Sequence, residues 1–249
     1  MGAASFAERS GDYAAARPTY PPELFDWIAG QCASREAAWD CATGNGQAAL
    51  GLAARFATVH ATDLSLEQVA HGFAAPNIVY AAAPAERSGF PPASFDLVTV
   101  AQALHWFDFP RFWTELSRVA RPGAFFCAWG YSWFDPEPEL DAALLAPLRR
   151  LLDPFWAPAN RILWNGYPSA DIAFPFDRLS TPSFRIELEW RLADLLAYVR
   201  TWSAAKAAER DPDAAARLAA LSEAAERSID GTRRFPLAMP LSLVAARIG

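Results

Sequence analysis

The chain has 249 residues, of which 53% are hydrophobic and 20% charged, and its net charge at pH 7 is −6. This composition excludes a disordered chain, and its ten Trp and seventeen Phe supply more aromatic surface than a core alone needs. We therefore expect some of these rings to line a pocket. The absence of a basic stripe argues against a nucleic acid partner, whose affinity comes largely from neutralised phosphates.

The sequence gives no sign of a metal site, a disulfide or a membrane span. Its three cysteines and three histidines lack the spacing of metal ligands or of a disulfide framework. Free cysteines suit a reducing compartment, so we expect a cytoplasmic protein. No uncharged apolar run reaches the roughly 18 residues of a membrane span, and no membrane partner is expected. Both a monomer and a homodimer remain open.

Strand and helix patterns alternate through the first half of the chain. A helix is expected after Pro21-Pro22, and Ser65 has the capping-box spacing that opens another. Short apolar strands are predicted at 37–41, 58–62, 78–82, 95–100 and 124–129, with further helices at 47–55 and 110–120. This alternation predicts a parallel sheet with right-handed crossovers and a ligand at the carboxyl ends of its strands.

The pattern changes after Gly130 to Pro-, Trp- and Arg-rich sequence with helical pieces. A strand at 184–190, two helices and a final antiparallel strand at 237–246 follow. We therefore predict an α/β protein with a Rossmann-like, doubly wound, mostly parallel seven-stranded sheet, an antiparallel last strand and a small, mainly helical cap. The expected domains are a core with an N-terminal lid segment at 1–130, a substrate-recognition cap at 131–181 and the remainder of the core at 182–249.

The segment with the most chemical information joins the first two predicted strands. Gly44 and Gly46 follow the first strand, and Asp63 ends the second. Glycine permits positive φ and lets backbone N–H groups approach a ligand. An acid at the tip of the next strand suits the hydroxyls of a ribose. Dinucleotides and adenosyl compounds both fit this arrangement.

Asp40 favours the adenosyl compounds. The residues from Gly44 to Ala49 satisfy the G-x-G-x-x-A fingerprint of dinucleotide enzymes, but alone this match is weak. The negative charge of the Asp40 carboxylate at the strand tip would repel a pyrophosphate. That carboxylate is better suited to the ammonium group of an amino acid, or to ordering the glycine loop by accepting its N–H groups.

Asp40, the two glycines and Asp63 together make the chain resemble the class I S-adenosylmethionine-dependent methyltransferases with a type-11 methyltransferase domain. Asp40-Cys41-Ala42-Thr43-Gly44-Asn45-Gly46 looks like their first motif, and Pro84-Ala85-Glu86 resembles their adenine-binding loop, although many relatives carry Asp where Pro84 stands. The segment from Ala101 to Asp108, with His105-Trp106, resembles the branch related to trans-aconitate methyltransferases. The resemblance covers nearly the whole chain and is weakest at 131–181, where a substrate would be chosen.

The resemblance implies S-adenosyl-L-methionine as cofactor and S-adenosyl-L-homocysteine as product. It also implies a set of cofactor-binding residues in this chain: Tyr13, Arg17, Asp40, Ala42, Thr43, Gly44, Gly46, Asp63, Leu64, Ala85, Glu86 and Gln102.

In-line methyl transfer needs the acceptor to be held opposite the leaving sulfur, and it needs no nucleophilic side chain. The expected acceptor is a small molecule, with a carboxylate or a hydroxyl among the candidates, and Tyr20, Trp106 and Trp133 are the expected substrate-binding rings. His105 would either act as a base or only shape the pocket. Two other readings stay open: a non-catalytic protein that binds S-adenosyl ligands and, more distantly, an NAD(P)-dependent oxidoreductase.

Overall fold

The computed structural model describes residues 18–249, so Tyr13 and Arg17 lie outside the described residues and their roles stay predictions. Two compact units make up the described chain. The sheet unit comprises Thr19–Ser132, Arg161–Arg185 and Pro240–Gly249, and the helical unit comprises Trp133–Asn160 and Ile186–Met239. Within residues 18–249, no helix is both long and apolar enough to cross a membrane.

Seven strands form one sheet in the order β3-β2-β1-β4-β5-β7-β6. Their bounds are β1 Ala37–Cys41, β2 Thr58–Asp63, β3 Ile78–Ala82, β4 Phe95–Ala101, β5 Ala120–Tyr131, β6 Arg185–Trp190 and β7 Phe235–Ile248. Strands β1 to β5 pair in parallel, and β7 runs antiparallel to β5. The predicted Rossmann-like sheet is confirmed. The strand order reverses between β1 and β4, and ligands of such sheets bind at the carboxyl ends of the strands beside this point.

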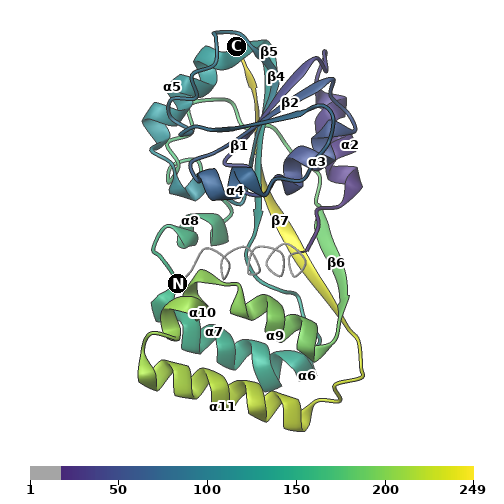
Figure 1. Cartoon of the computed structure of the whole chain (residues 1–249), viewed down its shortest axis with the longest axis vertical. Coiled ribbons are helices and arrows are strands. Elements are labelled where there is room, and N and C mark those ends of the chain that lie inside the picture. Colours follow the sequence, from purple (N-terminus) through teal and green to yellow (C-terminus); the bar gives the residue numbers. More distant parts are fainter. Residues whose placement is uncertain (1–17) are drawn as a thin grey trace. The chain divides into compact units, whose positions relative to one another are not determined.

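Helices cover both faces of the sheet in the sheet unit (Figure 1). Figure 1 shows α2 and α3 on one face and α5 on the other. The helices of this unit are α2 Pro22–Gln31, α3 Gln47–Ala53, α4 Leu66–Ala70, η1 Leu104–Trp106, α5 Phe109–Val119 and α8 Asn160–Trp164. The side chain of Ser65 accepts a hydrogen bond from Gln68 N at 3.3 Å, as the capping-box spacing predicts.

The helical unit is built from short helices and one long one. They are α6 Pro138–Leu140, η2 Asp141–Leu145, α7 Ala146–Leu152, η3 Asp153–Phe155, α9 Leu192–Arg200, α10 Ser203–Ala208 and α11 Pro212–Ser228. Asp211 caps α11 by accepting hydrogen bonds from Asp213 N and Ala214 N, both at 3.0 Å.

The two units divide the chain differently from the expected domains. Residues 161–181, expected in the cap, belong to the sheet unit, and residues 186–239, expected in the core, belong to the helical unit. Periodicity shows which residues of a helix are apolar, but not which neighbour they pack against. The sequence therefore predicted the helices, but not the elements that they pack against.

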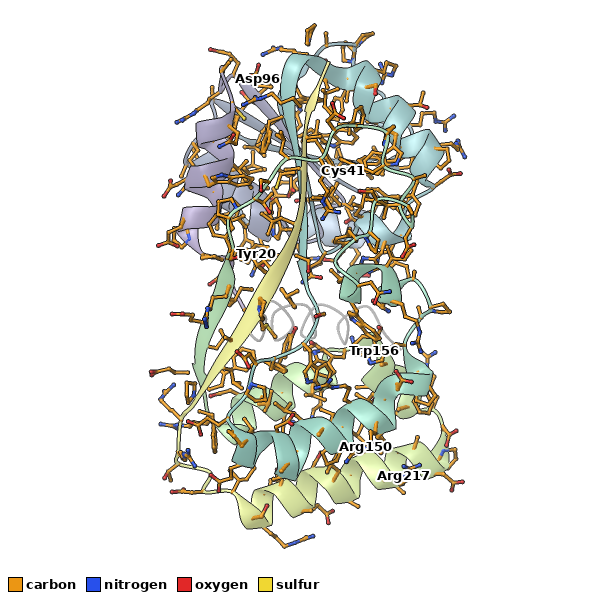
Figure 2. All side chains as sticks on the ribbon, turned by 180° about the vertical axis from the view of Figure 1, so that it is seen from behind. Tyr20, Cys41, Asp96, Arg150, Trp156 and Arg217 are labelled. Atoms are coloured by element: carbon orange, nitrogen blue, oxygen red, sulfur yellow. The ribbon has the colours of Figure 1, made fainter. Side chains whose placement is uncertain are left out.

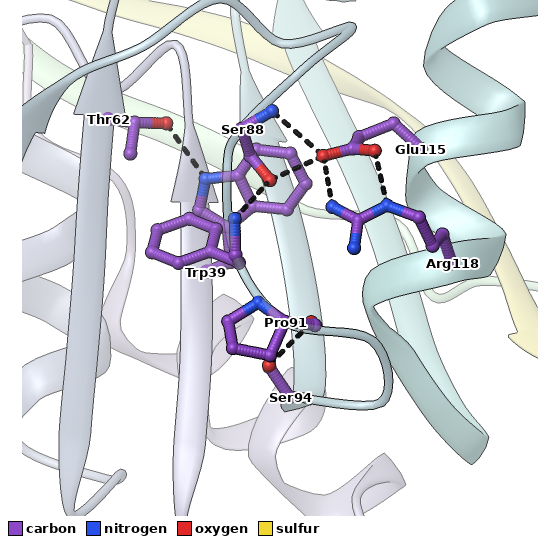
Figure 3. Close-up of polar contacts among 8 residues, drawn as sticks. Trp39, Thr62, Ser88, Pro91, Ser94, Glu115 and Arg118 are labelled. Carbon is purple, nitrogen blue, oxygen red and sulfur yellow. Dashed lines mark hydrogen bonds and ion pairs between the residues drawn. The ribbon is translucent and has the colours of Figure 1, made fainter.

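Aromatic packing fixes the centre of the sheet. Trp39 of β1 is fully buried, stacks on Phe95 at 6.0 Å between ring centroids, and donates from its indole nitrogen to Thr62 Oγ1 at 2.8 Å (Figure 3). Asp96 lies at the other end of β1 from Cys41 (Figure 2) and accepts from Ala37 N at 3.0 Å and from Arg121 at 2.7 Å. These contacts hold β1 and β4, the strands between which the order reverses, in register.

Candidate cofactor site

The loop between β1 and α3 turns sharply at three positions. Ala42, Gly44 and Gly46 have φ of 54°, 57° and 84°. Thr43 N donates to Thr62 O at 2.9 Å, and Gly46 N donates to Thr43 O at the same distance. A Cβ at Gly46 would overlap the side chain of Tyr80. The left-handed backbone and this close approach explain why glycine stands at position 46.

Asp63 joins this loop to the end of β2. Its Oδ2 accepts from Gly44 N at 2.8 Å, and its Oδ1 accepts from Ser65 N at 2.9 Å. Asp63 is half-buried, and each carboxylate oxygen keeps a second lone pair. It can therefore order the loop and still accept hydrogen bonds from the hydroxyls of a ribose.

Asp40 lies beneath the loop and is fully buried. Thr43 Oγ1 donates to its Oδ2 at 2.5 Å, and Thr99 Oγ1 donates to its Oδ1 at 2.9 Å. Burial raises the pKa of Asp40 to about 6, against the lowering effect of the two hydroxyls. Of the two roles expected from the sequence, the bond from Thr43 supports the ordering of the loop, although it comes from a hydroxyl and not from the expected N–H groups.

Tyr80 is a site residue that the sequence analysis missed. Its hydroxyl donates to Phe73 O at 2.9 Å, and its ring lies against Gly46 and Gly72. Burial and the carboxylate of Asp40 raise the pKa of Tyr80 to about 12. The alternation of β3 could have flagged Tyr80 as an inward residue, but nothing in the sequence placed it against a loop 34 positions earlier.

The next predicted residues lie in the loops after β2 and β3. Leu64, just after β2, is 78% exposed, whereas Ala85 is buried. Glu86 Oε1 accepts from Asp108 N at 3.0 Å, which ties the loop to the residue that caps α5. An exposed leucine beside Asp63 offers an apolar surface of the kind that a nucleobase can cover.

Three predicted site residues follow β4: Gln102 for the cofactor, His105 as the catalytic candidate and Trp106 for the substrate. Gln102 has φ of 57°, and its backbone N–H donates to Trp129 O at 2.8 Å. His105 is buried in η1, with its ring centroid 4.7 Å from that of Trp106, which is 55% exposed. His105 Nδ1 lies 3.1 Å from the hydroxyl of Tyr167.

The other two predicted substrate-binding rings lie in different units. Tyr20 belongs to the sheet unit and packs edge-on against Trp129 at 5.5 Å between centroids. Trp133 belongs to the helical unit, 5.2 Å from the ring of Trp202 and 5.0 Å from the Arg149 guanidinium carbon. No metal-binding cluster of His, Cys, Asp and Glu occurs in the described part of the chain.

This site has the features of a nucleotide-cofactor site in a doubly wound α/β protein: a glycine loop after the first strand and an acid at the tip of the second. The comparisons identify the family. Residues 39–128 match the family model described as a methyltransferase domain.

The similarity extends over most of the chain. It is 30% identical over 202 residues to a protein of Dictyostelium discoideum assigned as a methyltransferase, covering 80% of this chain and 76% of that protein. The structure of a protein from Anaeromyxobacter dehalogenans assigned as a type II methyltransferase superposes with a TM-score of 0.82 at 41% identity, covering 93% of this chain and 98% of that one. An uncharacterised methyltransferase of Mycobacterium tuberculosis is 38% identical over 120 residues, which are 48% of this chain and 49% of that protein.

The chain belongs to the methyltransferase domain family and is an S-adenosyl-L-methionine-dependent methyltransferase. The glycine loop and Asp63 fit such a cofactor, because the carboxylate keeps acceptor capacity next to a loop of small residues.

Proposed function

We propose that this enzyme methylates an oxygen atom of a small molecule, either a carboxylate or a hydroxyl. The observation that carries the proposal is the pair formed by buried His105 and exposed Trp106 in η1, the short helix that follows β4. The pair stands at the carboxyl end of the strand that neighbours β1 and its glycine loop. It combines one polar ring with one apolar surface, which suits a small acceptor carrying a single polar group.

The resemblance of the segment from Ala101 to Asp108 to the trans-aconitate methyltransferase branch points to the same class of acceptor. When bound, S-adenosyl-L-methionine supplies a methyl group on a cationic sulfonium. The protein's part is to hold the acceptor in line with that methyl group and to exclude water, so positioning supplies most of the rate. The aromatic rings of Trp106 and Tyr20 tolerate a cation and suit this task.

We assign the cofactor roles as follows. Asp63 accepts the ribose hydroxyls, Leu64 and Ala85 border the adenine, and Glu86 lies in the same loop. Asp40, Ala42, Thr43, Gly44, Gly46 and Gln102 shape the side of the site that takes the methionine end. Trp133, in the helical unit, keeps its predicted role as a substrate-binding ring.

Methyl transfer from radiolabelled S-adenosyl-L-methionine to a panel of small carboxylic acids, alcohols, phenols and amines tests this proposal. We expect label to appear in an ester or an ether that organic solvent extracts, and to be reduced in Asp63→Ala when the cofactor is limiting. Transfer to amines alone would contradict the oxygen acceptor. Binding of S-adenosyl-L-homocysteine without transfer to any compound would favour the non-catalytic alternative.

A further inference from the structure

Tyr167 joins the site from a distant part of the sequence. It follows α8 by three residues, is fully buried, and places its hydroxyl 3.1 Å from His105 Nδ1 across 62 positions of sequence. The two ring centroids lie 6.1 Å apart. Both residues belong to the sheet unit, so one body of the protein sets their geometry.

The backbone around Tyr167 is held tightly. Tyr167 has φ of 54°, and its N–H donates to Ile162 O at 2.9 Å. The guanidinium of Arg178 donates to the carbonyls of Tyr167 at 2.8 Å, Gly166 at 3.3 Å and Leu243 at 2.7 Å. These bonds tie the turn to β7. Tyr167 therefore presents its hydroxyl from a fixed support, as a residue that positions another must.

Hydrogen-bond satisfaction decides the direction of the bond between the rings. Burial raises the pKa of Tyr167 above its ordinary value, so its hydroxyl keeps its proton at neutral pH. Within residues 18–249, His105 Nδ1 is the one hydrogen-bond partner of that hydroxyl. A buried O–H group is costly to leave without an acceptor. The hydroxyl therefore donates, and Nδ1 accepts.

We propose that Tyr167 is a positioning residue that holds neutral His105 in the tautomer with its proton on Nε2. Any contact that the ring makes through Nε2 is then a donated hydrogen bond. In the proposed function, on which this inference rests, His105 would orient an acceptor oxygen by donating to it rather than by removing its proton. An acceptor that arrives already deprotonated fits this role, because it needs no base.

The ring nitrogens of His105 can be observed directly. In protein with ¹⁵N-labelled histidine at pH 8, where an ordinary histidine is neutral, long-range ¹H–¹⁵N correlation separates protonated from unprotonated ring nitrogens. The signals of His105 are those lost in His105→Gln. We expect an unprotonated Nδ1 and a protonated Nε2 in the wild type, and a shift toward a tautomer mixture in Tyr167→Phe.

Tyr80→Phe is the matched control, because it removes a tyrosine hydroxyl of the same unit that donates to Phe73 O and not to His105, and it should leave the His105 signals unchanged. A proton on Nδ1 in the wild type, or an unchanged His105 spectrum in Tyr167→Phe, would overturn the proposal. If Tyr167→Phe fails to fold, the tautomer of His105 in the wild-type protein tests the proposal by itself. The tautomer is read without an acceptor, so its outcome is separate from that of the transfer assay.

Discussion

The backbone N–H of Gly44 donates to Asp63 Oδ2 at 2.8 Å, which links the loop after β1 to the acid that ends β2. The same carboxylate also accepts from Ser65 N at 2.9 Å. One side chain thus fixes the glycine loop and the start of α4 together. This link gives a physical reason for pairing the glycine turn with an acid 19 positions later.

Asp63→Ala should weaken the binding of S-adenosyl-L-homocysteine. Hydrogen bonds to a charged group contribute about 1.5 to 3 kcal/mol each, so the loss of one to the ribose predicts roughly ten- to hundredfold weaker binding. Calorimetry measures the effect. Asp26→Ala is the control, because Asp26 is exposed and pairs with Arg55 on the surface at 2.7 Å. Equal affinities for the wild type and Asp63→Ala would remove the role assigned to Asp63.

Gly46→Ala should destabilise the protein more than Gly89→Ala does. Both glycines have positive φ, 84° and 79°, so alanine is strained at either position. At Gly46 the new Cβ would also overlap Tyr80, whereas at Gly89 no atom lies within 4 Å of it. Urea unfolding of the two variants isolates the cost of the overlap. Equal losses of stability would show that Tyr80 gives way freely.

Much of the sheet could be predicted from the sequence, because local patterns determine it. The predicted strands at 37–41 and 78–82 match β1 and β3, and the antiparallel final strand is confirmed. The fifth strand begins at Ala120, earlier than predicted, since Ala120 already pairs with Phe95 across a register shift. Pairing between strands is a long-range property, and the local sequence pattern did not reveal it.

The site was predictable where it is local in sequence. The glycine loop and Asp63 follow from short motifs, but the contacts of Tyr80 with Gly46 and of Tyr167 with His105 join residues 34 and 62 positions apart. The division into units was hidden for the same reason.

Asp40 should make stability fall as the pH rises. Burial raises its pKa to about 6 in the folded protein from 3.8, so the folded state binds the proton more tightly than the unfolded state. The stabilisation is complete below pH 4 and is lost as the pH rises through 6, with a slope of at most about 1.4 kcal/mol per pH unit. Urea unfolding between pH 4 and pH 7 should show this slope in the wild type but not in Asp40→Asn. An identical slope in the variant would assign the titration to another group.

Glu115 should have the opposite pH dependence. Its carboxylate accepts from Ser88 N at 2.8 Å and from Arg118 Nε at 2.8 Å (Figure 3), and the bond to Arg118 leads the contacts that lower its pKa to about 2. Its stabilisation is present above pH 4.5 and is lost as the pH falls toward 2. Glu115→Gln should therefore be less stable than the wild type at pH 7, with a smaller difference near pH 3. A difference that does not change with pH would exclude this charge effect.

The cofactor assignment is tested most directly by calorimetric titration of S-adenosyl-L-homocysteine into the wild-type protein, with NADH titrated in parallel. We predict saturable binding of S-adenosyl-L-homocysteine at one site per chain and no binding of NADH. Binding of NADH without binding of S-adenosyl-L-homocysteine would contradict the assignment of the glycine loop and Asp63 to an adenosyl cofactor.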